Sequence, residues 1–175
     1  MGHNHKVLTS SSKHDWQTPE SFLCCVRQIK DIALDPCSTD KNPTKAVRFI
    51  TEKDNGLTRD WKYYLAGPRR YPFGLVFVNP PYGRAVADWA RKVRQEADEG
   101  VEIVLLVPAR TDTLWWQETY LKARACLLWR GRIHFVDPNR ITTKTEAAPF
   151  PVSVFYFGPH RGLFVSAMSH RGVMI

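Results

Sequence analysis

Apolar and polar positions along this chain follow two patterns, one typical of helices and one typical of buried strands. Between residues 20 and 29 the apolar residues are three or four positions apart, which is the spacing of one helical face. A helix is also expected over residues 84–99, and another from a cap at Asp112 or Thr113 to about Arg124. Short apolar runs predict strands at 32–34, 47–51, 75–78, 101–107, 125–129 and 151–157, and a last strand is expected at 162–167.

Capping and turn residues mark several of the predicted boundaries. Thr18 is the expected N-cap of the first helix, and Pro19 is its expected first residue. Asp35-Pro36 is expected to end the first strand. Gly100 is expected to stop the second helix in the position after its C-cap, because glycine adopts the left-handed conformation there at little cost.

Strands that alternate with helices predict an α/β fold of three layers, with a mostly parallel sheet and an antiparallel strand near the C-terminus. The chain has 175 residues, a length that suits one domain. We therefore assign residues 15–175 to a single domain of reduced size without a separate target-recognition domain, and residues 1–14 to a disordered tail. Residues 57–73 are expected to be irregular, and residues 136–149 are expected to form a polar loop.

Two polar segments follow predicted strands and are expected to form one site. The first is Asp-Pro-Cys at residues 35–37, and the second is Asn-Pro-Pro-Tyr at residues 79–82. Ligands of parallel α/β sheets bind outside the carboxyl ends of the strands. Because both segments follow strands, both should lie at that edge of the sheet, where they would form a composite site.

The Asn-Pro-Pro-Tyr segment suits chemistry on an amino group attached to a flat ring. Such a nitrogen is a poor nucleophile, because its lone pair is delocalised into the ring. The side-chain oxygen of Asn79 and the backbone carbonyl of Pro80 can accept its two hydrogens, and the rings of Pro80 and Pro81 hold that carbonyl in place. Tyr82 can stack on the ring. The alternative interpretation is a rigid turn after a buried strand.

Composition and charge favour an anionic partner. The formal net charge is +8 and the sequence pI is about 9.5, which favours nucleic acid or an anionic surface. Arg130, Arg132 and His134 form a small basic cluster. No apolar run is long enough to span a bilayer and no signal peptide is seen, so a soluble cytoplasmic protein is expected. The cysteines form no CxxC pair, and no metal site is expected.

The motifs together resemble one enzyme family. They are DWQTP (15–19), LDPCSTDKN (34–42), FITEKDNGL (49–57), FVNPPYG (77–83), LLVPARTDTLWW (105–116) and RGRIHF (130–135). In this combination the chain resembles the phage-type DNA N6-adenine methyltransferase family, often called Dam, over about residues 14–158. The resemblance implies a Rossmann-like methyltransferase domain and a reaction that transfers a methyl group to the N6 amino group of adenine, with Asn79, Pro80, Pro81 and Tyr82 holding the base.

The resemblance also implies S-adenosylmethionine as the cofactor. Thr18 and Pro19 match the segment that touches its methionine part. Asp35 ends the first strand, where the family holds the amino end of the cofactor or its surroundings. The loop after this strand lacks a glycine-rich motif and must supply contacts in another way, with Cys37 and Asn42 as candidates.

An acidic residue after the second strand is the candidate for binding the cofactor's ribose. A carboxylate can accept hydrogen bonds from both ribose hydroxyls. Asp54 is the preferred candidate, and Glu52 is the less favoured one.

DNA is the partner that the resemblance implies. A base inside a duplex is out of reach, so the enzyme must flip it out of the stack. Arg84 and Arg110 are candidates for phosphate contacts, Trp115 for stacking or for filling the gap left by the base, and the loop 136–149 for sequence reading. The resemblance suggests a phage or prophage origin, with methylation shielding DNA from restriction.

Two other functions fit the same residues. The amino group could belong to RNA or to a protein glutamine, because related motifs serve those substrates and basic charge suits RNA equally well. The chain could also be an inactive DNA-binding homologue or an inhibitor of a host enzyme, although such a protein has no reason to keep Asn79. A nuclease is excluded, because the His-Asn-His sequence at 3–5 lies in the predicted tail.

Overall fold

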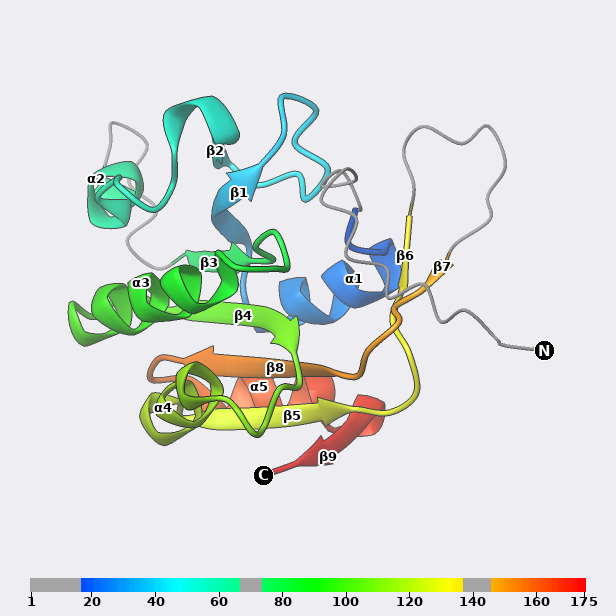
Figure 1. The fold of residues 1–175 in the computed structure, drawn as a ribbon. Helices are drawn as coiled ribbons and strands as arrows, with labels where there is room; N and C mark the ends of the chain where they lie inside the picture. Colours follow the sequence, from blue (N-terminus) through cyan, green and yellow to red (C-terminus); the bar gives the residue numbers. More distant parts are fainter. Residues whose placement is uncertain (1–16, 67–73, 137–145) are drawn as a thin grey trace.

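A computed structural model describes residues 17–66, 74–136 and 146–175 of the chain (Figure 1). The helices are α1 (Glu20–Ile29), α2 (Trp61–Ala66), α3 (Val86–Asp98), α4 (Leu114–Lys122) and α5 (Arg161–Met168), with short 3-10 turns η1 (Glu52–Asp54) and η2 (Ser169–Arg171). The strands are β1 (Ile32–Ser38), β2 (Arg48–Thr51), β3 (Leu75–Val78), β4 (Ile103–Pro108), β5 (Ala125–Trp129), β6 (His134–Phe135), β7 (Glu146–Ala147), β8 (Val152–Phe157) and β9 (Gly172–Met174).

Seven strands of the described chain form one mixed sheet in the order β2-β1-β3-β4-β8-β5-β9. The pairs β1–β2, β1–β3 and β3–β4 are parallel, whereas β8 is antiparallel to β4 and β5, and β9 is antiparallel to β5. The arrow of β8 therefore runs against those of its two neighbours (Figure 1). The prediction of a mostly parallel sheet with an antiparallel strand near the C-terminus is confirmed. Strands β6 and β7 form a separate ribbon.

Apolar side chains are buried on both faces of the sheet. Along β3, Leu75 and Phe77 join one core cluster, and Val76 and Val78 join the other. Side chains of α1 and α5 complete the first cluster, and side chains of α2, α3 and α4 complete the second. Because residues on both faces of the central strands are buried, these strands are continuous apolar runs in the sequence.

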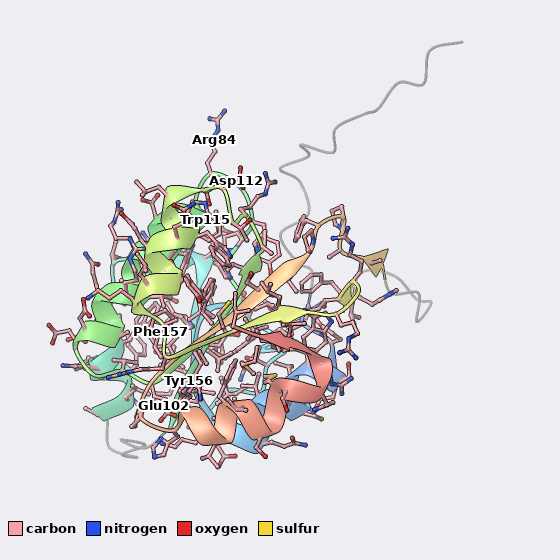
Figure 2. All side chains as sticks on the ribbon, turned by 90° about the horizontal axis from the view of Figure 1, so that it is seen from below. Arg84, Glu102, Asp112, Trp115, Tyr156 and Phe157 are labelled. Carbon is pink, nitrogen blue, oxygen red and sulfur yellow. The ribbon has the colours of Figure 1, made fainter. Side chains whose placement is uncertain are left out.

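The strand order reverses between β1 and β3. The chain passes from β1 to β2 on one side, and from β3 to β4 on the other. We call the edge where β1 to β5 end the carboxyl edge. In Figure 2, Arg84 and Asp112, which follow β3 and β4, lie at one end of the molecule, and Glu102, which precedes β4, lies at the other. A reversal of this kind opens a crevice at the carboxyl edge, where α/β proteins bind ligands.

Gly100 ends α3 as predicted. Its φ is 87°, in the region that favours glycine. Its amide donates to the carbonyl of Ala97 (2.9 Å), and the amide of Val101 donates to that of Glu96 (3.0 Å), which satisfies two carbonyls of the last turn.

The prediction that Thr18 caps α1 is wrong. Pro19 occupies the capping position, and its carbonyl accepts hydrogen bonds from the amides of Phe22 (2.9 Å) and Leu23 (3.2 Å). The hydroxyl of Thr18 makes no capping bond, because it accepts a hydrogen bond from Asn79 instead. Thr18 is thus correctly spaced for a cap, but its hydroxyl bonds Asn79 at the end of β3.

Two segments were assigned to the wrong class from the sequence. Residues 162–167 were expected to be a strand but belong to α5, where Phe164, Ala167 and Met168 are buried at helical spacing. Residues 57–73 were expected to be irregular, yet α2 forms around Trp61, which is fully buried and donates from Nε1 to the carbonyl of Gly56 (2.9 Å). In both cases a few buried side chains stabilise a helix too short to give a clear periodic pattern.

Strand β1 does not stop at Asp35-Pro36 as predicted but continues to Ser38. Its pairing with β2 shifts register between Asp35 and Ser38. Proline has no amide hydrogen to donate to the ladder and is tolerated at such an irregularity. The shift brings Asp35 and Cys37 to the carboxyl edge within a strand instead of in a loop.

Three predicted segments lie wholly or partly outside the described residues. The tail at 1–14 is outside them, as are residues 67–73 of the segment expected to be irregular. Of the predicted polar loop at 136–149 only the ends are described, with β7 at residues 146–147. The described helices contain none that is long and apolar enough to cross a membrane. All four cysteines are free thiols.

Candidate active site

The Asn79 side chain is held between two hydroxyl groups where the chain leaves β3. Its Nδ2 donates to Thr18 Oγ1 (3.0 Å), and its Oδ1 accepts from the Tyr82 hydroxyl (2.6 Å). An amide oxygen has two lone pairs, so one acceptor position on Oδ1 remains for a substrate. The amide is therefore oriented before any substrate binds.

Tyr82 points back into the protein. Its ring is half-buried and meets Phe150 (centroids 5.3 Å apart, interplanar angle 78°) and Phe135 (6.1 Å, 68°) edge to face. Its hydroxyl also lies 3.4 Å from the carbonyl oxygen of Leu106 in β4. Stacking of Tyr82 on a substrate ring stays a prediction, whereas its bond to Asn79 gives it a positioning role that was not predicted.

The two prolines between Asn79 and Tyr82 shape the backbone of the site. Pro80 is buried and Pro81 is half-buried. Within the described part of the chain, no hydrogen bond uses the Pro80 carbonyl. This carbonyl is thus available as the second acceptor that the sequence predicted.

Asp35 carries a buried carboxylate close to this segment. Only 4% of the residue is exposed, its Oδ1 accepts from the amide of Cys37 (3.0 Å), and its Oδ2 accepts from the Thr44 hydroxyl (2.8 Å). Burial raises the pKa of Asp35 from 3.8 to about 6, and hydrogen bonds from Thr44, the Cys37 amide and Ser38 oppose that rise. At neutral pH the carboxylate is mostly ionised and has no cationic partner among the described residues, so it can attract a cationic ligand.

Cys37 joins the Asp35 carboxylate to the Asn79–Tyr82 segment. Burial raises the pKa of its thiol well above the ordinary value, the charge of Asp35 adds to the rise, and the backbone amide of Asn79 opposes it. Burial also raises the pKa of the Tyr82 hydroxyl, with Cys37 as a second cause. Both groups therefore stay protonated at neutral pH. The two segments that the sequence predicted to lie together do lie together.

The loop after β1 is shaped by Asn42. Its Oδ1 accepts from the amide of Ala46 (3.1 Å), its Nδ2 donates to the carbonyl of Ala46 (2.9 Å), and its φ is 44°. The same loop positions Thr44, which bonds Asp35. The described contacts of Asn42 are thus internal to the loop, and its predicted contact with a cofactor stays a prediction.

Two hydroxyl groups follow Cys37 at the end of β1. The Oγ1 atom of Thr39 is buried and makes no hydrogen bond in the described structure, whereas the buried hydroxyl of Ser38 lies close enough to the Asp35 carboxylate to lower its pKa. A buried polar atom without a partner carries a free-energy cost that a ligand can remove. With the ionised Asp35 beside them, these groups fit a ligand that combines a cation with hydrogen-bonding groups, as S-adenosylmethionine does.

Asp54 lies apart from this cluster. It is exposed on η1, its Oδ2 accepts from the Thr51 hydroxyl (2.8 Å), and its carbonyl accepts from Arg59 Nε (2.8 Å). Both it and Glu52 follow β2 at the carboxyl edge, as predicted, and both are exposed. No described contact joins either one to Asp35 or Asn79.

The three predicted DNA contacts have different environments. Arg84 and Arg110 are exposed in the segments after β3 and β4, and no ion pair engages either side chain within the described chain. Trp115 is half-buried against the core cluster of α3 and α4. None of the three contacts the Asn79 group in the described structure.

Thr44, Phe135 and Phe150 belong to the site but were not predicted from the sequence. Thr44 holds Asp35, and the two phenylalanines hold Tyr82. A signal for Phe135 was present, because the buried residues Ile133 and Phe135 alternate with exposed ones. The other two leave no such pattern.

The described residues contain no group of three or more His, Cys, Asp or Glu side chains that could hold a metal ion. The site instead offers an oriented amide, an unbonded carbonyl, a buried carboxylate and the buried hydroxyls of Ser38 and Thr39. These groups can bind a cation and accept hydrogen bonds from a planar amino group.

Comparisons with known proteins agree with this chemistry. The family model for DNA N-6-adenine-methyltransferase (Dam) matches residues 6–171. The DNA N-6-adenine-methyltransferase of Haemophilus phage HP1 (strain HP1c1) is 28% identical over 152 residues, an alignment that covers 85% of this chain and 81% of the phage protein. No solved structure matches the chain.

Proposed function

The chain belongs to the DNA N-6-adenine-methyltransferase (Dam) family, and on that premise we propose that it methylates the N6 amino group of adenine in DNA with S-adenosylmethionine as methyl donor. The observation that carries the proposal is the Asn79 amide, fixed by Thr18 and Tyr82 beside the buried Asp35. This arrangement matches the needs of a weakly nucleophilic amino group next to a cationic donor.

Asn79 and Pro80 are the residues that bind the amino group of the substrate. The free acceptor position of Asn79 Oδ1 takes one hydrogen of the adenine amino group, and the Pro80 carbonyl takes the other. Both bonds draw electron density toward the nitrogen and strengthen as it becomes tetrahedral and positively charged. The bond from Tyr82 to Oδ1 keeps the amide from rotating as the substrate enters.

The residues at the end of β1 hold the cofactor. When bound, S-adenosylmethionine supplies an electrophilic methyl group on a sulfonium. Asp35 attracts its positive charge, Ser38 and Thr39 offer hydroxyls, and Thr18-Pro19 and Cys37 line the approach to Asn79. Asp54, or Glu52 in its place, accepts the ribose hydroxyls.

The cofactor affinity should depend on pH through Asp35. Because its pKa is about 6, the carboxylate becomes ionised as pH rises from 5 to 7, and binding should be about tenfold weaker at pH 5 than at pH 7.5. Isothermal titration calorimetry of the methyl donor across this range measures the change. Asp35→Asn should bind weakly with little pH dependence, and a variant that keeps the wild-type profile would contradict the role of Asp35.

The same shift changes the stability of the cofactor-free protein with the opposite sign. The unfolded chain loses the Asp35 proton near its ordinary pKa of 3.8, and the folded chain loses it near 6, so the folded state binds more protons between these values. This contribution to the free energy of unfolding is therefore present below about pH 4 and lost as pH rises through 6. The free energy of unfolding is measured by chemical denaturation at pH 4, 5 and 7. In Asp35→Asn it should lack the decrease with rising pH that Asp35 causes in the wild type.

Tyr82→Phe should lower kcat about tenfold, because it removes one hydrogen bond that orients Asn79 and keeps the packing of the ring. Thr18→Val removes the bond on the other side of the amide and should have an effect of similar size. Single-turnover methylation measures both. Wild-type rates in the two variants would show that the amide needs neither hydroxyl.

Further features of the proposal follow from the substrate. Residues 15–175 form a single, three-layer Rossmann-like methyltransferase domain without a separate recognition domain, a description supported by helices on both faces of the sheet. The adenine is flipped into the Asn79 pocket. Arg84, Arg110 and Trp115 contact the DNA. The phage relative supports a phage or prophage role in the bacterial cytoplasm, where methylation protects DNA from restriction.

The activity is tested with methyl-labelled S-adenosylmethionine and three substrates: unmethylated DNA, RNA of the same sequence and a glutamine-containing protein. After digestion to nucleosides and amino acids, the label should appear in N6-methyldeoxyadenosine. Label only in RNA or glutamine would change the substrate class. Cofactor binding without any label would identify an inactive homologue.

A further inference from the structure

Two groups of cations in the described chain bear on the binding of a polyanion. One group forms ion pairs and lies mostly on the helices. These pairs are Arg27–Glu20, Lys30–Glu102, Lys62–Glu99, Arg91–Asp88, Lys92–Glu96, Arg94–Glu118 and Lys122–Asp98. Their charges are compensated within the protein, so they contribute little to attraction of a polyanion.

The other group follows the strand ends at the carboxyl edge. Exposed cations without an ion pair or side-chain hydrogen bond within the described chain come after β1, β2, β3, β4 and β5. They are Lys41, Lys53, Arg84, Arg110, Arg130 and Arg132. Lys45, Arg48 and Arg124 are also unpaired but lie nearer the amino ends of β1, β2 and β5. Arg59 and Arg161 donate to backbone carbonyls, and Arg171 lies over the ring of Trp129. Exposed acids lie close in sequence to Lys41, Lys53 and Arg110, whereas no described acid lies within three positions of Arg84, Arg130 or Arg132; the acids are Asp40, Glu52, Asp54 and Asp112. Positive charge without a nearby acid is therefore found after β3 and β5, on the edge that carries Asn79.

The turn between β5 and β6 concentrates this charge. Arg130 and Arg132 are both exposed, and Gly131 between them is exposed with a φ of 77°. Apart from its two chain neighbours, no atom of the described residues lies within 4 Å of where a Cβ of Gly131 would be, so the described part of the chain leaves the backbone of the turn uncovered. Two arginines this close, without an acid paired to either, suit phosphate groups, which guanidinium binds through parallel hydrogen bonds.

The turn is anchored on both sides. The amide of Arg130 donates to the carbonyl of Arg171 (2.9 Å), and the carbonyl of Ile133 accepts from the amide of Ala148 (2.7 Å). Ile133 and Phe135 are buried, with 3% and 6% of each residue exposed. Buried residues and backbone hydrogen bonds fix the conformation of the turn. Binding of a ligand to its arginines therefore costs less conformational entropy than binding to arginines on a flexible loop.

The same segment contacts two residues of the active site. Phe135 packs against Tyr82, with centroids 6.1 Å apart. Val136 and Gln17 exchange two backbone hydrogen bonds (2.9 and 3.0 Å), and Gln17 directly precedes Thr18. Tyr82 and Thr18 are the two residues that hold Asn79. The short segment 133–136 therefore connects the turn to the two residues that hold the Asn79 amide.

We propose that Arg130 and Arg132 bind backbone phosphates of DNA next to the target adenine and set the position of the strand relative to Asn79. The proposal rests on DNA being the substrate. This phosphate site is additional to the DNA contacts proposed for Arg84 and Arg110, which follow β3 and β4. Contacts of this kind position a nucleic acid without reading its sequence.

The test measures the binding of a fluorescent DNA duplex by anisotropy at salt concentrations between about 50 and 200 mM. Each phosphate contact contributes about 0.9 to the slope of the logarithm of the binding constant against the logarithm of the salt concentration. The double variant R130Q/R132Q should lower the slope by about 1.8. Its affinity deficit should be about tenfold greater at the low-salt end than at the high-salt end. R130K/R132K should keep most of the slope, because lysine still contacts phosphate as a point charge.

K62Q/K122Q is the matched control, because it removes the same charge from exposed side chains that are paired with Glu99 and Asp98. It should keep the wild-type slope. An unchanged slope in R130Q/R132Q, an equal loss in the control, or tighter binding of RNA of the same sequence would each overturn the proposal.

If the wild-type protein binds duplex DNA through these arginines but does not methylate it, the proposed reaction fails and the phosphate site stands. If it methylates DNA and the slope is unchanged, only the phosphate site fails.

Discussion

Asn79→Ala will lower the rate of methyl transfer to DNA by about 10²- to 10³-fold, the usual loss when one preorganised group that stabilises a transition state is removed. In the proposed mechanism the variant loses the acceptor for the adenine amino group, and it leaves the hydroxyls of Thr18 and Tyr82 without their shared partner. Because the bond to Oδ1 strengthens in the transition state, kcat should fall far more than the affinity for cofactor or DNA. Single-turnover kinetics with calorimetric titration of the cofactor separate these effects.

Asn79→Asp is the matched control for that experiment. A carboxylate keeps an acceptor for the substrate and for Tyr82, and the Thr18 hydroxyl can donate to it in place of accepting. Its rate should lie well above that of Asn79→Ala. Equal rates in the two variants, or a wild-type rate in Asn79→Ala, would show that the acceptor is not what the reaction needs. A melting curve for each variant excludes unfolding as the cause of a low rate.

Gly56→Ala will reduce the free energy of unfolding by about 3 kcal/mol, at the upper end of the cost of overpacking. A Cβ at this buried position would lie 2.0 Å from the carbonyl oxygen of Pro36 and 3.0 Å from the Trp89 ring. The first contact is with backbone, so it can be relieved only by moving β1 or the backbone at residue 56. Since Asp35 and Cys37 flank Pro36, cofactor binding should weaken as well. Urea denaturation and cofactor titration measure the two effects.

Gly162→Ala is the matched control for this substitution. Gly162 lies in α5. Among the described residues, a Cβ added there would have no atom within 4 Å other than the helix backbone itself and its neighbours in the chain. Replacing a helical glycine by alanine usually stabilises a protein by about 0.5–1 kcal/mol. If both variants lost stability equally, the close approach of Gly56 to Pro36 would not be the cause.

The central strands were predictable because their environment leaves a strong pattern. Strands β3, β4, β5 and β8 are apolar on both faces, since helices cover one or both sides of each, and their predicted and observed bounds differ by two residues at most. The end of α3 was predictable for a different reason. Gly100 adopts a positive φ that few other residues tolerate, so the sequence itself marks the turn.

The short helices were not predictable because their stability comes from contacts distant in sequence. In α5 a run of six residues, 162–167, contains apolar residues that fit a strand as well as a helix. Packing of Phe164 against Tyr156 of β8, with stacked rings 5.1 Å apart, selects the helix. In α2 one buried tryptophan, Trp61, anchors a helix whose remaining residues are exposed or half-buried.

The sequence by itself determined the family, the α/β class and the position of the site at the carboxyl edge, because motifs and apolar runs are local properties of the chain. Only the tertiary structure decided how the site is held. Whether Thr18 caps a helix or binds Asn79, whether Tyr82 points outward or toward Phe150, and which arginines lack an ion pair depend on groups distant in the sequence. Side chains with several available partners choose among them by packing and burial, and local sequence does not contain that information.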